Sequence, residues 1–194
     1  MSCRTARALG VLLILSGGLL LARDAGLRAK GVLAGHLVAR AFERHLRDGG
    51  RQPPWPWADT YPLARLEVER LGVRAYVLSG AQGASLAFGA GHLHGTAPPG
   101  GRGHVVLAGH RDTSFAFLRE LRRGDRIRLR THGGDRSWIV EEVAVAAEDD
   151  LSVIEPTAED RLTLLTCYPF EGPIGSPWRY VVTALPESRL ARSP

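Results

Sequence analysis

From Pro62 onward, residues that favour turns divide the chain into short apolar runs. Several runs alternate apolar with polar side chains, which is typical of strands that bury one face. Glycine and proline clusters separate them, and one helix is expected over residues 114–122. The runs cover residues 64–71, 74–79, 85–93, 104–110, 125–131, 137–148, 162–168 and 179–185. So many short strands at close spacing predict an all-β sandwich or barrel.

Residues 8–22 form an uncharged, largely apolar segment, with Arg4 and Arg7 before it. A membrane-spanning helix usually needs ~20 apolar residues, so this segment is short. Two interpretations remain, a cleaved signal peptide and an uncleaved single-pass anchor whose arginines reach the interface. Leu20 stands where a cleavage site prefers a small residue, so we expect an uncleaved anchor over residues 1–25. The basic start then stays in the cytoplasm, and the rest of the chain lies outside it.

The net charge of +5 comes from the N-terminal part of the chain. Residues 1–51 carry nine basic and three acidic side chains, whereas residues 52–194 carry 16 basic and 17 acidic ones. A basic excess beside an apolar segment favours anionic lipid as the partner. The same distribution argues against a nucleic-acid-binding face on the β-domain. We therefore expect contact with a membrane and none with nucleic acid.

The segment between the apolar stretch and the β-domain has two parts. Apolar residues within 26–47 recur near helical spacing, which predicts an amphipathic helix. Prolines among the residues after it exclude a helix or a central strand, so we expect a linker that ends at residue 60. Trp55 and Trp57 of this linker are expected to cover part of the domain surface. Residues 61–186 would form the domain, and residues 187–194 a C-terminal tail.

Cys3 and Cys167 are the only cysteines in the sequence. If residues 1–25 anchor the chain, a membrane separates the two thiols and they do not pair. An unpaired thiol in an oxidising compartment is unusual unless it has a function, although a buried structural cysteine is the alternative. Cys167 closes an apolar run and precedes Tyr168-Pro169, which places it at the rim of the sheet. A nucleophile would be accessible there.

A cysteine nucleophile reacts as the thiolate and benefits from a cationic neighbour. His110 ends one apolar run, and Arg179 begins the last one. All three residues stand at strand ends, which allows one shared rim, and a guanidinium there would stabilise a developing oxyanion. The domain has five histidines, which are His92, His94, His104, His110 and His132. The pattern does not select His110 among them, and a structural role for His110 or Arg179 stays open at this point.

Three motifs follow one another along the chain: GHRDTSF (109–115), TLLTC (163–167) and RYVV (179–182). They resemble the signatures of the sortase family, and TLLTC is the most specific of them. GHLHGTAPPG (91–100) is similar to the segment that precedes the histidine strand in that family. The PWPWAD stretch (54–59) and the pattern as a whole resemble the class GN sortases of Gram-negative proteobacteria.

The resemblance covers residues 55–185 and implies a closed eight-stranded β-barrel with a Cys–His–Arg site. Matched motif by motif, the nucleophile is Cys167, the histidine His110 and the arginine Arg179. The implied activity is that of a cysteine transpeptidase that needs no metal or cofactor. Its substrate would be an exported protein with an LPXTG-like sorting signal near the C-terminus, and the sequence does not identify the amine that accepts it. The implied location is the inner (cytoplasmic) membrane, with the domain on the periplasmic side.

His104 departs from the family pattern, in which many relatives carry asparagine. It lies six residues before His110, so a continuous strand would place both imidazoles on one face. Stabilisation of the turn before the strand is the other interpretation of His104. Three further hypotheses for the chain remain. They are an L,D-transpeptidase, although its Ser-His-Gly-Cys context is absent, a metal site of His92, His94, His104 and Cys167, and a non-catalytic anchored domain that binds a partner.

Overall fold

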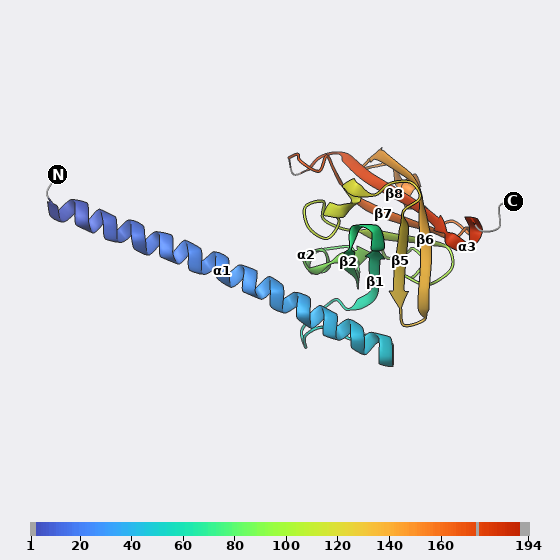
Figure 1. Cartoon of the computed structure of the whole chain (residues 1–194), viewed down its shortest axis with the longest axis horizontal. Coiled ribbons are helices and arrows are strands. Elements are labelled where there is room, and N and C mark those ends of the chain that lie inside the picture. The colour runs from blue at the N-terminus through green and yellow to red at the C-terminus, as the bar shows by residue number, and fades with distance from the viewer. Residues whose placement is uncertain (1–2, 174, 191–194) are drawn as a thin grey trace. The chain divides into compact units, whose positions relative to one another are not determined.

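The computed structural model describes residues 3–173 and 175–190 (Figure 1). These residues divide into two units, one up to His36 and one from Leu37 onward. The first element, α1 (Cys3–Asp48), is one uninterrupted helix. The separate anchor and amphipathic helices expected from the sequence are therefore a single helix, because no proline interrupts residues 3–48. The helix ends at Asp48, and the next residue, Gly49, has a positive φ of 67°, which suits glycine.

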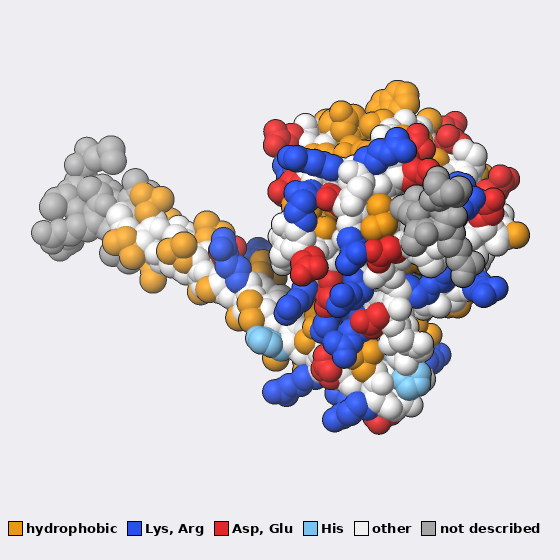
Figure 2. Space-filling view, turned by 45° about the vertical axis from the view of Figure 1, so that its right-hand side comes forward, with side chains coloured by type: hydrophobic (Ala, Val, Ile, Leu, Met, Phe, Trp, Pro, Cys, Tyr) orange, Lys and Arg blue, Asp and Glu red, His pale blue; other side chains and the backbone are white. Residues whose placement is uncertain are grey.

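The large apolar side chains of α1 among residues 12–21 are exposed. The exposed fractions of the leucines and the isoleucine among residues 12–21 run from 63% to 75%. Figure 2 shows such side chains in orange along the helix. Across the described residues, no helix has an apolar stretch of the length that crossing a membrane requires.

Eight strands of the described chain close into a barrel (Figure 1). Their order around the barrel is β1-β2-β3-β4-β7-β8-β6-β5. The pairs β2·β3 and β4·β7 are parallel, and the other neighbours are antiparallel. The strands are β1 (Pro62–Val68), β2 (Val73–Ser79), β3 (Ala90–His92), β4 (His104–Ala108), β5 (Arg126–Thr131), β6 (Gly134–Ala147), β7 (Arg161–Tyr168) and β8 (Trp178–Pro186). This confirms the closed eight-stranded β-barrel expected from the sequence.

The alternation of apolar and polar residues decides which side of the barrel wall each side chain faces. In β5, Ile127, Leu129 and Thr131 are buried, and the arginines between them are exposed. The inward side chains meet in one core around Trp138, which is fully buried. On the outer face shown in Figure 2, basic and acidic side chains are interleaved over the barrel. The charges on that face therefore do not gather into one basic patch.

Residues 85–93 do not form the single strand that the sequence predicted. The first half of this run is a short helix, α2 (Ala84–Phe88), and only β3 pairs with the barrel. The Ser85 hydroxyl donates to the Ser79 carbonyl oxygen at 2.9 Å, so the chain folds back over the end of β2. A Cβ on Gly91 would lie 2.3 Å from the Gly80 carbonyl oxygen. The glycine therefore allows β3 to pack directly against backbone.

The helix predicted over residues 114–122 is present but shorter than expected. The segment contains a 3₁₀-helix, η2 (Ala116–Glu120). Phe115, Leu118 and Leu121 are buried, and their spacing of three matches the three residues per turn of this helix type. The other short helices are η1 (Glu69–Leu71), η3 (Leu151–Val153) and α3 (Glu187–Leu190).

The last turns of α1 belong to the same unit as the barrel. Phe42 is fully buried, and its ring meets Tyr76 edge to face, with 5.5 Å between the centroids. Trp55 covers part of the domain as expected, because its ring centroid lies 5.1 Å from that of Phe88. Trp57 does not cover the domain, since 82% of it is exposed.

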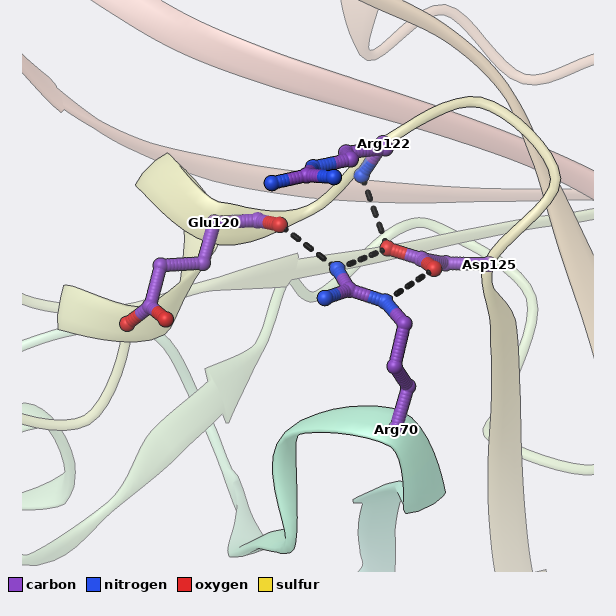
Figure 3. A network of polar contacts seen from close by, with 4 residues as sticks. All are labelled: Arg70, Glu120, Arg122 and Asp125. Atoms are coloured by element: carbon purple, nitrogen blue, oxygen red, sulfur yellow. Dashed lines mark hydrogen bonds and ion pairs between the residues drawn. The ribbon is translucent and has the colours of Figure 1, made fainter.

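A buried carboxylate joins η1 to the turn before β5 (Figure 3). Asp125 accepts hydrogen bonds from Nε and Nη2 of Arg70, both at 2.6 Å, and from the Arg122 N–H at 2.8 Å. Nη2 of Arg70 also donates to the Glu120 carbonyl oxygen at 2.7 Å. The hydrogen bond from Arg70 lowers the pKa of Asp125 below its ordinary value of 3.8. The ionised carboxylate therefore stabilises the folded protein.

Replacing Asp125 with asparagine is expected to lower the free energy of unfolding by about 2 kcal/mol at pH 7, because charge-assisted hydrogen bonds are lost. The stabilisation is present above the unfolded pKa and disappears as the pH falls through the lower folded pKa. The difference from the wild type should therefore shrink below about pH 4. Urea unfolding at pH 7 and at pH 3 measures both effects, with the same substitution at exposed Asp149 as the control. Equal stability of Asp125→Asn and the wild type at pH 7 would contradict this prediction.

Candidate active site

The parallel strands β4 and β7 bring His110 and Cys167 to the same end of the barrel. Just beyond their last register pair, the Gly109 N–H donates to the Leu165 carbonyl oxygen at 3.1 Å. The Thr166 hydroxyl donates to the Gly109 carbonyl oxygen at 2.7 Å. His110 directly follows Gly109, and Cys167 directly follows Thr166, so both residues lie at one rim of the barrel.

The antiparallel pair β7·β8 brings Arg179 to this rim. Cys167 and Arg179 are register partners, and directly opposed residues of antiparallel strands place their side chains on one face with Cβ atoms ~4.5–5.5 Å apart. The Cys167 thiol is free and exposed. A buried structural cysteine, the alternative weighed from the sequence, is therefore wrong, and the thiol is accessible to a substrate.

Three acceptors hold the Arg179 guanidinium. Its Nη2 donates to Oε2 of Glu148 at 2.7 Å, and its Nη1 donates to the carbonyl oxygens of Ser176 at 2.8 Å and Trp178 at 3.0 Å. Glu148 directly follows β6, which pairs with β8. A guanidinium has five N–H donors, and the Arg179 side chain is 26% exposed. Donors therefore remain for a substrate oxygen.

His110 is exposed and lies in the turn after β4. Its carbonyl oxygen accepts a hydrogen bond from the Phe115 N–H at 2.9 Å, which closes the backbone of this turn. Among the hydrogen bonds of the described residues, none involves the imidazole of His110. The three predicted residues thus share a rim without side-chain hydrogen bonds between them. In a reacting complex the imidazole must come within about 3 Å of the atom to which it donates.

His104 lies at the start of β4, away from this rim, so of its two interpretations the one that places a second imidazole beside His110 is wrong. Its Nδ1 lies 2.7 Å from the Glu155 carbonyl oxygen, and its Nε2 lies 2.7 Å from the Thr163 hydroxyl. β4 ends at Ala108, so strand alternation does not extend to His110. His104 is buried, and burial lowers its pKa. It ties the start of β4 to the segment before β7, which fits the alternative role in stabilising this turn.

Two of the three histidines proposed for a metal site, His92 and His104, have hydrogen-bond partners elsewhere. Nε2 of His92 lies 2.9 Å from the Ala97 carbonyl oxygen, and both ring nitrogens of His104 have partners. Within residues 3–173 and 175–190, no three His, Cys, Asp or Glu side chains gather in an arrangement suited to a metal ion. The arrangement therefore gives no support to the metal hypothesis.

Two residues near the rim were absent from the sequence predictions. Glu148 closes the run 137–148, and only the pairing of β6 with β8 brings it to Arg179. Arg111 directly follows His110 within the GHRDTSF motif, and its contacts lie some sixty residues away in the sequence. Its place beside the predicted histidine was the one signal that pointed to it.

Comparison with known proteins agrees with the motifs. A family model described as the sortase domain matches residues 66–187. Sortase D of Bacillus subtilis (strain 168) is 33% identical over 118 residues, which cover 60% of this chain and 60% of that protein. Among solved structures, Sortase A from Corynebacterium diphtheriae has a TM-score of 0.61 and 27% identity, covering 67% of this chain and 62% of the other. The catalytic domain of SrtD from B. anthracis has a TM-score of 0.56 and 34% identity, covering 64% and 86%.

The closed barrel and the rim that carries Cys167 define a sortase-type β-barrel domain. The chain belongs to the sortase family, because the family model matches more than half of its length. It spans 60% of the length of the Bacillus relative.

Proposed function

We propose that this protein is a sortase-type cysteine transpeptidase. Cys167 is the nucleophile, His110 the general acid and base, and Arg179 the stabiliser of the oxyanion. The observation that carries the proposal is the strand register. It pairs Cys167 directly with Arg179, and the neighbouring parallel strand β4 leads into the turn that carries His110 at the same rim. The exposed thiol adds accessibility to this arrangement.

The reaction has two steps. In the first, the Cys167 thiolate attacks a peptide carbonyl carbon, and Arg179 donates hydrogen bonds to the oxyanion that forms. His110 donates a proton to the leaving amine, so that the C–N bond breaks and a thioester on Cys167 Sγ remains. In the second, an incoming amine attacks the thioester carbonyl, His110 accepts a proton from it, and the thiolate leaves. One amide bond is broken and one is formed, so the reaction needs no redox partner.

The proposed substrate is an exported protein with an LPXTG-like sorting signal near its C-terminus, cleaved after the threonine. The acceptor is an amine, since only an amine regenerates an amide from the thioester. The support for this substrate class is the match of GHRDTSF, TLLTC and RYVV to the family. The exposure of Cys167 and His110 is consistent with a peptide that approaches from outside the barrel.

Purified full-length protein should be incubated with a library of LPXTG-like peptides, with and without a primary amine. We expect cleavage at one bond, a product that carries the added amine, and a transient acyl mass on the peptide that contains Cys167. Mass spectrometry detects all three. The absence of cleavage and of any acyl-enzyme across the library would contradict the proposed function.

We also propose that the N-terminal part of α1 attaches the protein to the inner membrane as a single-pass anchor, with the barrel on the periplasmic side. The uncharged residues 8–22, the exposed leucines among residues 12–21 and the basic excess of residues 1–51 support this location. The PWPWAD stretch (54–59) supports assignment to the class GN sortases.

Fractionation of a Gram-negative host that expresses the full chain tests the attachment. The wild type should sediment with membranes and resist alkaline extraction, whereas a variant with Leu13→Asp and Leu20→Asp should be extracted. Recovery of the wild type in the soluble fraction would contradict the attachment. If the wild type sediments with membranes but alkaline extraction releases it, that result would contradict the single-pass topology.

A further inference from the structure

Arg111 bonds three backbone carbonyls of the segment that follows the nucleophile. Its Nη1 donates to the Pro169 carbonyl oxygen at 2.6 Å. Its Nη2 donates to the carbonyl oxygens of Gly172 and Pro173, the latter at 2.9 Å. The three acceptors lie within five residues of one another, so a single guanidinium fixes the start of the connection between β7 and β8.

The two ends of this contact are next to the two proposed catalytic residues. Arg111 directly follows His110, and Pro169 lies two residues after Cys167. The guanidinium therefore connects the turn that carries His110 to the chain segment that follows Cys167. These hydrogen bonds of Arg111 lie beyond the last register pair of β4 and β7, where strand pairing no longer sets the distance between the two segments.

The geometry requires arginine and a tight turn. A planar guanidinium directs several N–H donors outward in a fixed fork, whereas a lysine ammonium is a point charge that cannot reach the same set of acceptors. A Cβ on Gly172 would lie 2.6 Å from Cγ of Pro169, so glycine allows the segment to curl around the guanidinium. Both residues are thus suited to this one contact.

We propose that Arg111 is a positioning residue that holds His110 at the distance from Cys167 that proton donation to the leaving amine requires. This inference rests on the proposed transpeptidase function. His110 is exposed and its imidazole has no hydrogen bond among the described residues, so the backbone of its turn determines where the ring lies. A displacement of about 1 Å at a reacting group costs on the order of 100-fold in rate.

Arg119 provides a matched control on the same segment. Its Nη1 lies 3.6 Å from Oε1 of Glu171, and its guanidinium lies 5.3 Å from the Phe170 ring centroid. Both contacts are with side chains, and the Arg119 side chain is 46% exposed. Arg119 therefore touches the connection between β7 and β8 without bonding its backbone. A lysine at position 119 should retain most of what this arginine contributes.

The experiment compares Arg111→Lys, Arg111→Ala and Arg119→Lys on two substrates with one peptide sequence. One has the amide bond, whose leaving nitrogen must be protonated, and the other a thioester, whose leaving sulfur needs no proton. For Arg111→Lys we expect kcat for acylation by the amide to fall about 10- to 100-fold with KM within about twofold. The thioester should react within about threefold of the wild-type rate, because it does not depend on proton donation. Arg119→Lys should match the wild type on both substrates.

The outcomes distinguish a failure of the positioning role of Arg111 from a failure of the proposed transpeptidase function. An equal loss on amide and thioester, or an unchanged kcat in Arg111→Lys, overturns the positioning role while the wild type stays active. If Arg111→Ala does not fold, Arg111→Lys still gives the comparison, with thermal unfolding as the check on its fold. A wild-type protein that acylates with neither substrate overturns the proposed function itself, and the inference with it.

Discussion

Replacing Cys167 with alanine is expected to abolish transpeptidation, lowering turnover by a factor of at least about 1,000. The reaction proceeds through a thioester, and no other described side chain at this rim supplies a thiol. Cys167 is exposed, so truncating it leaves no cavity and should change the free energy of unfolding by less than about 0.5 kcal/mol. This variant should therefore lose its transpeptidase activity while its free energy of unfolding stays close to that of the wild type.

Peptide cleavage, amine transfer and thermal unfolding of the variant measure this separation. Cys3→Ser is the control, because it removes the other cysteine of the sequence and should leave turnover intact. In the Cys3→Ser background, iodoacetamide should label one site, and the same label should block turnover. Retained amine transfer by Cys167→Ala would remove Cys167 from the mechanism.

Replacing Arg179 with lysine is expected to lower kcat by about 100- to 1,000-fold, the usual cost of losing an oxyanion donor. Lysine keeps the positive charge but not the planar fork. In the folded protein this fork bonds Glu148 and the carbonyl oxygens of Ser176 and Trp178 while other donors remain. An ammonium cannot keep these contacts and also bond a substrate oxygen.

Steady-state kinetics with the cleaved peptide tests this expectation, with KM and kcat determined separately. Arg189→Lys is the matched control, since Arg189 also pairs with a glutamate, at 3.0 Å from Glu159, outside the proposed site. The control should retain wild-type kinetics. Near-normal kcat in Arg179→Lys would show that the oxyanion is stabilised by other groups.

Several parts of the fold could be predicted because they depend on local pattern. Ile127 and Leu129 alternate with arginines, and this period of two decides which face of β5 enters the core. The predicted elements differ from the structure where a tertiary contact overrides the local sequence pattern. Ser85 bonds the end of β2 and turns the expected strand back over it. Phe115, Leu118 and Leu121 are buried in and beside a 3₁₀-helix that is shorter than the helix predicted over residues 114–122.

The sequence alone predicted strands that could form a barrel and an unpaired thiol at the end of one of them. Its resemblance to family motifs selected His110 and Arg179 as the other site residues. It did not show that these residues meet, because strand pairing joins positions about sixty residues apart for His110 and twelve apart for Arg179. Only the tertiary structure decided the register that opposes Cys167 to Arg179 and brings His110 to their rim. It also decided the contacts of Glu148 and Arg111, since hydrogen bonds between distant segments leave no period in a sequence.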